Sequence, residues 1–400
     1  MTKKELFASA EKCLRWIENN MLTEGRGARG VYERIRTDLN VRVELCRPDV
    51  ASEYLWALLL FRKTGKTEYD DVFENVTRWL VYAQNDQKKD KNTAFPFYLT
   101  DGKKDLPKME RLYQNDNGKV LVNLCRLYEE TGDERFVTMA KKCADFWVGV
   151  QKRNGVFFKR FVHLKKNESE GPCFILWLMT GLFCLSKITG EEKYAAAGRK
   201  AFAAARRQIK GGRMRTSFEI GGAEAWRPLS SENHIALLCF ALSYKYTGDQ
   251  VFIDAIQEIL PFCDRLVDPK TGAVKNCDGS APKASLNNSE TLCDFVYTQG
   301  YAFLAMIELY KVLGDEKYLR RAEKAAAFAI ETQLTEGDPK TDGAWRGSYD
   351  IRTKKAEGRC NQRNSLDEGG KYSVYTGWCA LPITAGLLSL YLMEKTDGEK

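Results

Sequence analysis

The sequence has little histidine and no paired cysteine motif, and both shortages restrict the kinds of site it can form. Its 400 residues contain two histidines, and its 12 cysteines never form a C-x-x-C pair. Structural zinc sites need closely spaced cysteine and histidine ligands, so we expect no metal, and no motif indicates another cofactor. The scattered cysteines are typical of small buried apolar residues in a reducing compartment.

Long hydrophobic runs are also missing. No stretch of 18 apolar residues occurs, which predicts no membrane-spanning helix and no membrane partner. No apolar segment follows Lys3 and Lys4 before Glu11, so no secretory signal is predicted and we expect a cytoplasmic protein. The net charge of +8 is mild and no recognition module is visible, so nucleic acid is not an expected partner.

What the sequence does contain is a repeated signature. In five segments an aromatic or small residue precedes a glycine by four positions, an acid or lysine follows, and an aromatic comes four residues after the glycine. The glycines are Gly65, Gly132, Gly190, Gly248 and Gly314. Glycine ends a helix by adopting the left-handed conformation, and an acid favours the start of the next helix. Each repeat therefore predicts one helical hairpin.

The hairpins add up to a closed set of helices. The sequence predicts helices at about 4–21, 50–64, 67–85, 115–130, 133–151, 172–189, 191–209, 231–247, 249–266, 294–313, 315–333 and 375–394. The first and last lack partners, so pairing them closes a ring and makes residues 1–400 a single domain. The helices that follow long loops are the more apolar ones and should line the inside. We predict an all-α (α/α)6 toroid of twelve helices with short β-strands in the long loops on one face.

Five of the long loops contain a similar short segment, which we predict to be a strand after each outer helix. These segments are Gly30-Val31-Tyr32, Gly155-Val156-Phe157, Gly212-Arg213-Met214, Gly272-Ala273-Val274 and Gly343-Ala344-Trp345. They could be decoration on the loops or the wall of a cleft.

Twelve helices with tight Thr-Gly-Asp turns on one rim and long loops on the other resemble the six-hairpin glycosidases and their relatives. That resemblance implies a toroid that serves glycoside hydrolases, sugar epimerases and polysaccharide lyases. The long loops also carry 33 lysines and arginines against 20 acids, in a chain whose net charge is only +8. One rim is therefore expected to be positive and to attract an anion, unless it is only a solvated face.

The starts of the predicted inner helices meet at the long-loop face, and acids lie at several of them. The candidates for catalysis are Asp49, Asp116, Glu170 and Glu232. Each could instead be a helix cap, because acids suit a helix start whatever the function. Asp116, after Tyr113-Gln114-Asn115 and before Asn117-Gly118, is similar to the aspartate at this helix start in unsaturated glucuronyl and rhamnogalacturonyl hydrolases. The resemblance implies a second aspartate before the next inner helix, where this sequence has Glu170.

Other residues near the same face are candidates for substrate binding. Arg47 could bind an anion, and Tyr372 lies before the last inner helix. His234 falls one turn into an apolar helix and is either a core histidine or a ligand at the mouth. The tryptophans beside the loops could stack on sugar rings or pack in the interior; they are Trp226, Trp345 and Trp378.

Together these features predict a glycoside hydrolase that uses carboxylate acid–base catalysis on a short, anionic, uronic-acid-containing oligosaccharide. One alternative is a lyase with Tyr372, His234 and Arg47, or a sugar isomerase on the same toroid. Sugar 2-epimerases of this fold use two facing histidines, whereas the last inner helix here offers Tyr372 and Tyr375. A second alternative is a non-catalytic toroid that binds a glycan or another partner.

Overall fold

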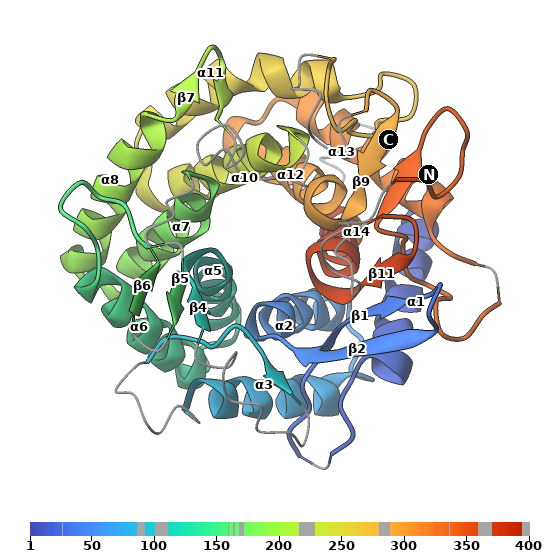
Figure 1. Ribbon diagram of the computed structural model, residues 1–400, viewed down its shortest axis with the longest axis horizontal. Coiled ribbons are helices and arrows are strands. Elements are labelled where there is room, and N and C mark those ends of the chain that lie inside the picture. The colour runs from blue at the N-terminus through green and yellow to red at the C-terminus, as the bar shows by residue number, and fades with distance from the viewer. Residues whose placement is uncertain are drawn as a thin grey trace.

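A computed structural model describes residues 1–25, 27–85, 93–100, 111–158, 160–162, 165–167, 172–215, 229–279, 289–335, 337–358 and 370–393. Within these residues twelve α-helices form two concentric rings (Figure 1), which confirms the predicted (α/α)6 toroid. The inner ring comprises α2 (Pro48–Arg62), α5 (Gln114–Thr131), α7 (Pro172–Thr189), α10 (Leu229–Thr247), α12 (Gly300–Leu313) and α14 (Leu381–Leu392). The outer ring comprises α1 (Lys3–Asn20), α3 (Asp70–Asn85), α6 (Glu134–Gly149), α8 (Glu192–Arg206), α11 (Val251–Leu266) and α13 (Glu316–Thr332).

The two rings differ in how their helices are buried. Every residue of α5 from Gln114 to Leu127 is buried, whereas α6 buries one face and exposes the other. A helix that is surrounded by others needs apolar residues on all sides, and an outer helix needs them on one side only. In the described part of the chain no helix has the length and apolar character needed to cross a membrane.

The inner ring is closed. Neighbouring inner helices pack in chain order, and α14 packs on α2 to complete the circle. Outside it, α1 packs on both α14 and α13, so the first helix fills the gap beside the last one.

Tight turns connect each inner helix to the outer helix that follows it. The α5–α6 turn is typical: Gly132 has a φ of 67°, and Asp133 accepts a hydrogen bond from the backbone N–H of Arg135. The other glycines of the signature also have positive φ values. In the first hairpin the aromatic rings of Phe61 and Tyr69 pack edge to face across the turn, with centroids 5.1 Å apart. The signature therefore marks the helix ends as predicted.

Short antiparallel strands occupy the opposite face. A four-stranded sheet has the order β11 (Ser373–Tyr375), β1 (Tyr32–Arg36), β2 (Val41–Cys46), β3 (Leu99–Thr100). The smaller sheets are β4 (Arg111–Tyr113), β5 (Arg160–Val162) and β6 (Lys165–Asn167); β7 (Ile209–Lys210) and β8 (Arg213–Met214); and β9 (Leu292–Asp294) and β10 (Ser348–Asp350).

The predicted strands after the outer helices are only partly correct. Strands occur at 32–36 and 213–214, and Val274 forms an isolated bridge. The segments at 155–157 and 343–345 are not strands. Each segment bonds through two backbone hydrogen bonds to one residue just after the outer helix, which is Lys152 for the first segment and Leu334 for the second. These segments are too short to build the ladder that defines a strand.

Candidate active site

Arg47 lies at the centre of a buried ion-pair cluster where α2 begins. Its Nε and Nη2 donate to the two carboxylate oxygens of Asp49, both at 3.0 Å. Its Nη1 donates to Glu33 at 2.7 Å, and Nη2 also donates to Asp116 at 2.9 Å. Four of the five guanidinium N–H groups are therefore donated to carboxylates, which fixes the orientation of Arg47.

Lys119, inside α5, is a second buried cation in the same cluster. Its Nζ lies 3.2 Å from Asp49 Oδ2 and 3.1 Å from Glu53 Oε1. The hydroxyl of Tyr301, across the ring on α12, donates to the same oxygen of Glu53 at 2.7 Å. The ammonium group also lies 3.5 Å from the centroid of the Trp378 ring. The cluster thus joins three inner helices, with ion pairs that are almost entirely shielded from water.

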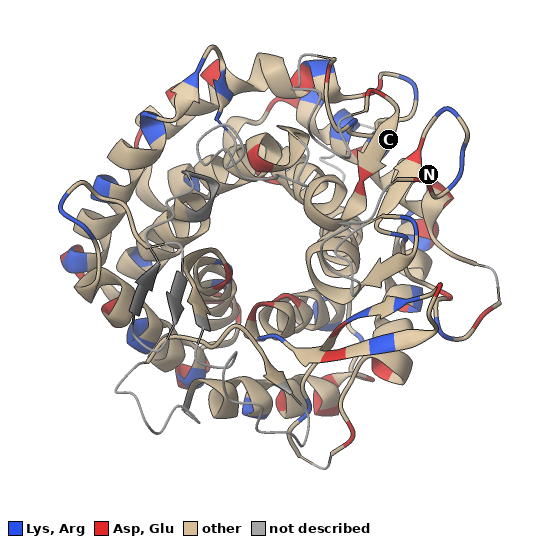
Figure 2. Ribbon diagram, in the orientation of Figure 1, with Lys and Arg blue, Asp and Glu red and all other residues tan. Residues whose placement is uncertain are grey.

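Strand β1 extends the cluster toward the long-loop face. Glu33 pairs with both Arg47 and its neighbour Arg34. The Nη1 of Arg34 donates to the hydroxyl of Tyr375 at 2.6 Å, and these two residues are also partners in the β1–β11 pairing. The acids and bases at the inner helix starts are visible in Figure 2 on α2 and α5. The strand pair therefore connects the interior charges with the rim of the molecule.

Trp378 has a strained backbone at the start of the last inner helix. It lies in the wide turn η2 (Thr376–Ala380), which precedes α14, and its φ and ψ are 63° and −21°. Its backbone N–H donates to Glu53 at 3.0 Å, and its Nε1 donates to Asp49 at 2.6 Å. A bulky residue in this backbone conformation raises the free energy of the fold by about 1–3 kcal/mol, so it persists only where its surroundings hold it. Residues strained in this way are often found at functional sites.

The charges in the cluster shift one another's proton affinity. Burial alone would raise the pKa of the Asp49 carboxyl, but Arg47, Lys119 and the bond from Trp378 together lower that pKa below its usual value. Burial opposes the charge of Arg47, yet its carboxylate neighbours raise the pKa of the guanidinium well above its usual value. Asp49 is therefore an ionised group that holds its cations in place.

The four carboxylates of the cluster differ in how much of their side chains is exposed to solvent. The side chain of Asp49 is 0% exposed, that of Glu33 2% and that of Glu53 8%, whereas that of Asp116 is 13% exposed. A carboxylate must touch its substrate to act on it, so Asp116 is the group in this cluster that solvent and a ligand can reach best. Because Arg47 holds both aspartates through one nitrogen, their bonded oxygens lie within about 6 Å of each other. The burial of Asp49 denies it contact with a substrate.

Neither aspartate is a side-chain helix cap, which was the simpler interpretation. The caps of α2 and α5 are Arg47 and Tyr113, and neither helix start has a side-chain capping bond. Both Asp49 and Asp116 are bonded to the side chain of Arg47. They also lie in the first turns of their helices, where an acid favours the helix start.

Glu232 and His234 lie at the start of α10, but both are 1% exposed. The Nδ1 of His234 lies 2.8 Å from the carbonyl oxygen of Ser230, and the charges that act on its ring belong to Asp264 and Arg321 on the outer helices. Burial lowers the pKa of His234 to about 4. His234 is therefore a buried, neutral residue, as expected for a core histidine, and its role as a ligand at the mouth stays a prediction.

The remaining predicted residues separate into three places. Trp345 is fully buried and its Nε1 donates to the carbonyl of Ala329 on the outer helix α13, which agrees with the alternative that it packs in the interior. Tyr372 is 38% exposed and lines a cavity at the rim. Trp378 lies in the cluster. Glu170 and Trp226 are outside the described residues.

Sequence reasoning missed several members of the cluster as candidates. Glu33 and Arg34 lie on a strand, not at a helix start, and Tyr301 lies inside α12. Lys119 had a usable signal: a lysine on a helix whose other faces are buried must find partners, because an unpaired buried ammonium is very costly. Its carboxylate partners could not be read from the sequence because they come from a different helix.

No protein-family model matches this chain, and no curated protein matches its sequence. Similar solved structures include cellobiose 2-epimerase from Bacillus thermoamylovorans, with 14% identity over 97% of this chain and 98% of that one and a TM-score of 0.72. The GH76 alpha-mannanase of Bacteroides thetaiotaomicron has 13% identity over 96% and 95% of the chains and a TM-score of 0.68. An unsaturated glucuronyl hydrolase specific for heparin has 13% identity over 98% and 97% and a TM-score of 0.66.

These structures share the fold along nearly their whole length. The chain thus has the (α/α)6 toroid fold of these structures, which is the fold that its resemblance to the six-hairpin glycosidases implied. Identities this low establish the architecture and leave the activity to the residues of the site.

Proposed function

We propose that this protein is a carbohydrate-active enzyme, a glycoside hydrolase that cleaves a short oligosaccharide containing uronic acid. The observation that supports this most directly is the Asp116 carboxylate, partly exposed and bonded to the buried Arg47 at the starts of the inner helices. Hydrolysis of a glycosidic bond requires two carboxyl groups, one to donate a proton and one to act as base or nucleophile. Solved structures with this fold include two glycoside hydrolases.

The electrostatics indicate which role suits each carboxyl group. An ion pair with Arg47 at 2.9 Å suits a carboxylate that acts as base or nucleophile better than a carboxyl group that donates a proton. We assign the donor role to Glu170, which precedes α7 in the sequence, and α7 packs beside α5. Asp49 acts through Arg47 and Lys119 as a positioning residue, and Glu232 is too buried to be a strong candidate.

The alternative reactions fit the residues less well. A reaction that uses two facing histidines would need both histidines of the sequence, and His234 is buried with its Nδ1 2.8 Å from the carbonyl oxygen of Ser230. A lyase built from Tyr372, His234 and Arg47 would need three residues with quite different surroundings: a rim cavity, the buried start of α10 and the buried cluster at the start of α2. The hydrolase is therefore the better-supported proposal.

The test is the replacement Asp116→Asn, assayed on an unsaturated uronyl disaccharide. A hydrolase removes the ultraviolet absorbance of this sugar, a lyase acting on a saturated one creates absorbance, and a binding protein does neither. We expect Asp116→Asn to lower turnover by about 10²- to 10⁴-fold while the fold is retained. The matched control is Asp133→Asn, a helix cap on the opposite rim, which should lose about 1 kcal/mol of stability and keep full turnover. Full turnover in Asp116→Asn would refute the assignment.

A further inference from the structure

A cavity of about 740 Å³ lies at the rim, apart from the buried cluster. It is bounded by the end of α13, by the turn after β1, and by residues 354–356 and 371–372. These last two segments belong to the long loop between α13 and α14, which carries eight lysines and arginines against seven acids. The charge of the cavity therefore depends on which of these residues form its wall.

The charged residues in the cavity wall are mainly basic. Arg346, Lys354, Lys355 and Lys371 line the cavity, and none of the three lysines forms an ion pair within the described part of the chain. Of the three acids in the wall, Asp38 is already held by Arg36 through bonds of 2.8 and 2.6 Å. The wall thus retains an excess of positive charge.

The turn that carries two of these lysines is firmly built. Asp350 bonds to Lys354 and Lys355 through its backbone at 2.8 and 2.9 Å, and its carboxylate accepts the N–H groups of Arg352 and Thr353. Lys354 has a φ of 56°, an uncommon conformation for a residue with a side chain. This bracing holds both lysines at the cavity instead of leaving them on a loose loop.

An aromatic side chain completes the wall. Tyr372 is 38% exposed and lies beside Lys371, whose Nζ is 5.0 Å from the centroid of the tyrosine ring. Tyr349, half-buried, lines the same cavity. An exposed aromatic ring next to cations that form no ion pair with other described residues offers both surfaces that an anionic sugar needs: a flat apolar face and partners for its carboxylate.

The cavity is connected to the buried cluster by two paired strands. Arg34 and Tyr375 are opposite each other in β1 and β11, and three residues further along, Thr37 donates to the carbonyl of Tyr372 at 2.9 Å. At about 3.3 Å per residue, the two points lie roughly 10 Å apart along the strands. An oligosaccharide whose end reaches Asp116 could therefore extend along this face toward the cavity.

From this geometry we propose that the rim cavity binds an anionic sugar unit, with the carboxylate held by Lys355 and Lys371 and the ring stacked on Tyr372. The proposal rests on the proposed function only in that the ligand is a sugar. It adds a binding site at a distance from the reacting bond, and a reason for the enzyme to prefer charged oligosaccharides over neutral ones.

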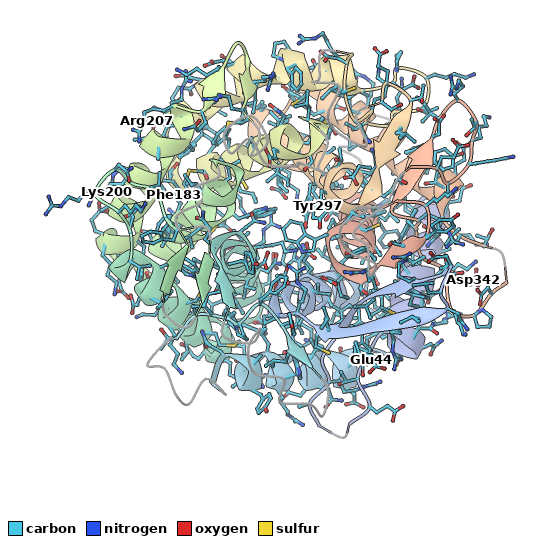
Figure 3. All side chains as sticks on the ribbon, in the orientation of Figure 1. Glu44, Phe183, Lys200, Arg207, Tyr297 and Asp342 are labelled. Carbon is cyan, nitrogen blue, oxygen red and sulfur yellow. The ribbon has the colours of Figure 1, made fainter. Side chains whose placement is uncertain are left out.

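The experiment measures binding of a uronate-containing oligosaccharide and of a neutral oligosaccharide of equal length by titration calorimetry. We expect the double variant Lys355→Gln with Lys371→Gln to bind the uronate sugar about tenfold more weakly, with the neutral sugar unaffected. Tyr372→Ala should weaken both sugars. The matched control is Lys66→Gln with Lys200→Gln, which removes the same charge from exposed lysines of the outer surface; Lys200 points away from the ring in Figure 3.

The possible outcomes separate this site from the hydrolase proposal. Unchanged affinity for the uronate sugar in the lysine variant, or an equal loss for both sugars, would overturn the anionic site. The same loss in the control variant would also overturn it, because net charge alone would then explain the effect. Two results together would support the anionic-sugar site and refute the hydrolase proposal. They are that Asp116→Asn still binds the uronate sugar at the rim cavity, and that the native protein turns over none of the sugars tested.

Discussion

His234 is a buried histidine whose environment predicts a measurable pH dependence. Because a carbonyl oxygen can only accept, the Nδ1 facing Ser230 carries the proton of a neutral ring. In the folded protein the pKa of His234 is about 4, whereas its usual pKa, which applies in the unfolded chain, is 6.5. Between pH 6.5 and pH 4 the unfolded chain therefore binds a proton that the folded protein does not. The free energy of unfolding should therefore fall as the pH drops from 6.5 toward 4, by about 3 kcal/mol in total, with no further change below that.

The contribution of His234 can be isolated with His234→Gln, whose amide can still donate to Ser230. Urea unfolding at pH 7.5 and pH 4.5 should show that the native protein loses about 2–3 kcal/mol more than this variant. Other groups, including Asp49, affect both proteins alike and cancel in the difference. If both proteins lose the same stability, His234 is not held neutral by burial and its position in the core is wrong.

At the scale of the helix, close packing makes Gly118 sensitive to the smallest substitution. A Cβ added at this position in α5 would lie 2.2 Å from the backbone nitrogen of Leu178 and 2.6 Å from the carbonyl carbon of Trp177. Since backbone cannot move aside easily, we expect Gly118→Ala to destabilise the fold by about 1–3 kcal/mol despite the better helix propensity of alanine. Turnover should also fall, because the start of α5 positions Asp116.

Gly149→Ala provides the matched control, because a Cβ there meets nothing within 4 Å at the end of α6. This variant should be neutral or up to about 1 kcal/mol more stable in the same urea unfolding measurement. Equal stability of the two variants would mean that α5 and α7 do not pack as closely as described.

The residues at helix ends allowed the helices to be predicted from the sequence. Such local patterns give no prediction where distant parts of the fold set the backbone conformation. Gly132 ends its helix in any context, because its left-handed φ follows from the missing side chain. The left-handed φ of Trp378 has no such cause: it is fixed by bonds to Glu53 and Asp49 on a helix that is more than 300 residues distant in sequence. No propensity predicts a tryptophan there.

At the scale of the whole molecule, the closed ring predicted that the starts of the inner helices would meet, but not which of their side chains would stay exposed. Arg47, Asp49 and Asp116 were expected to meet because inner helix starts converge, and they do. Which acid remains accessible depends on how closely six helices and the strands approach one another, so the burial of Glu232 and of Trp345 could not be read from the sequence. The charge excess of the loops did indicate a positive rim, and the lysines of the α13–α14 loop that line the rim cavity are part of it.

The seam that closes the outer ring lies between α13 and α1, and Gln333 bridges it. Its amide oxygen accepts from the hydroxyl of Ser9 at 2.7 Å, and its nitrogen donates to the carbonyls of Ser9 and Gly343 at 2.9 and 2.8 Å. Removing this buried bridge with Gln333→Ala should cost about 2–4 kcal/mol, because three partners lose their bond and a space is left. The exposed Gln250→Ala should change stability by less than about 0.5 kcal/mol.

The way in which Gln333→Ala unfolds tests whether residues 1–400 form one domain. An open stack of repeats can unfold from its ends, but a closed ring has no end and should unfold as a unit. We therefore expect helix content by circular dichroism and tryptophan fluorescence to report one shared transition in urea, shifted to a lower midpoint in the variant without a change in slope. Two separate transitions, in either protein, would show that the ring opens in stages and that the single-domain proposal is wrong.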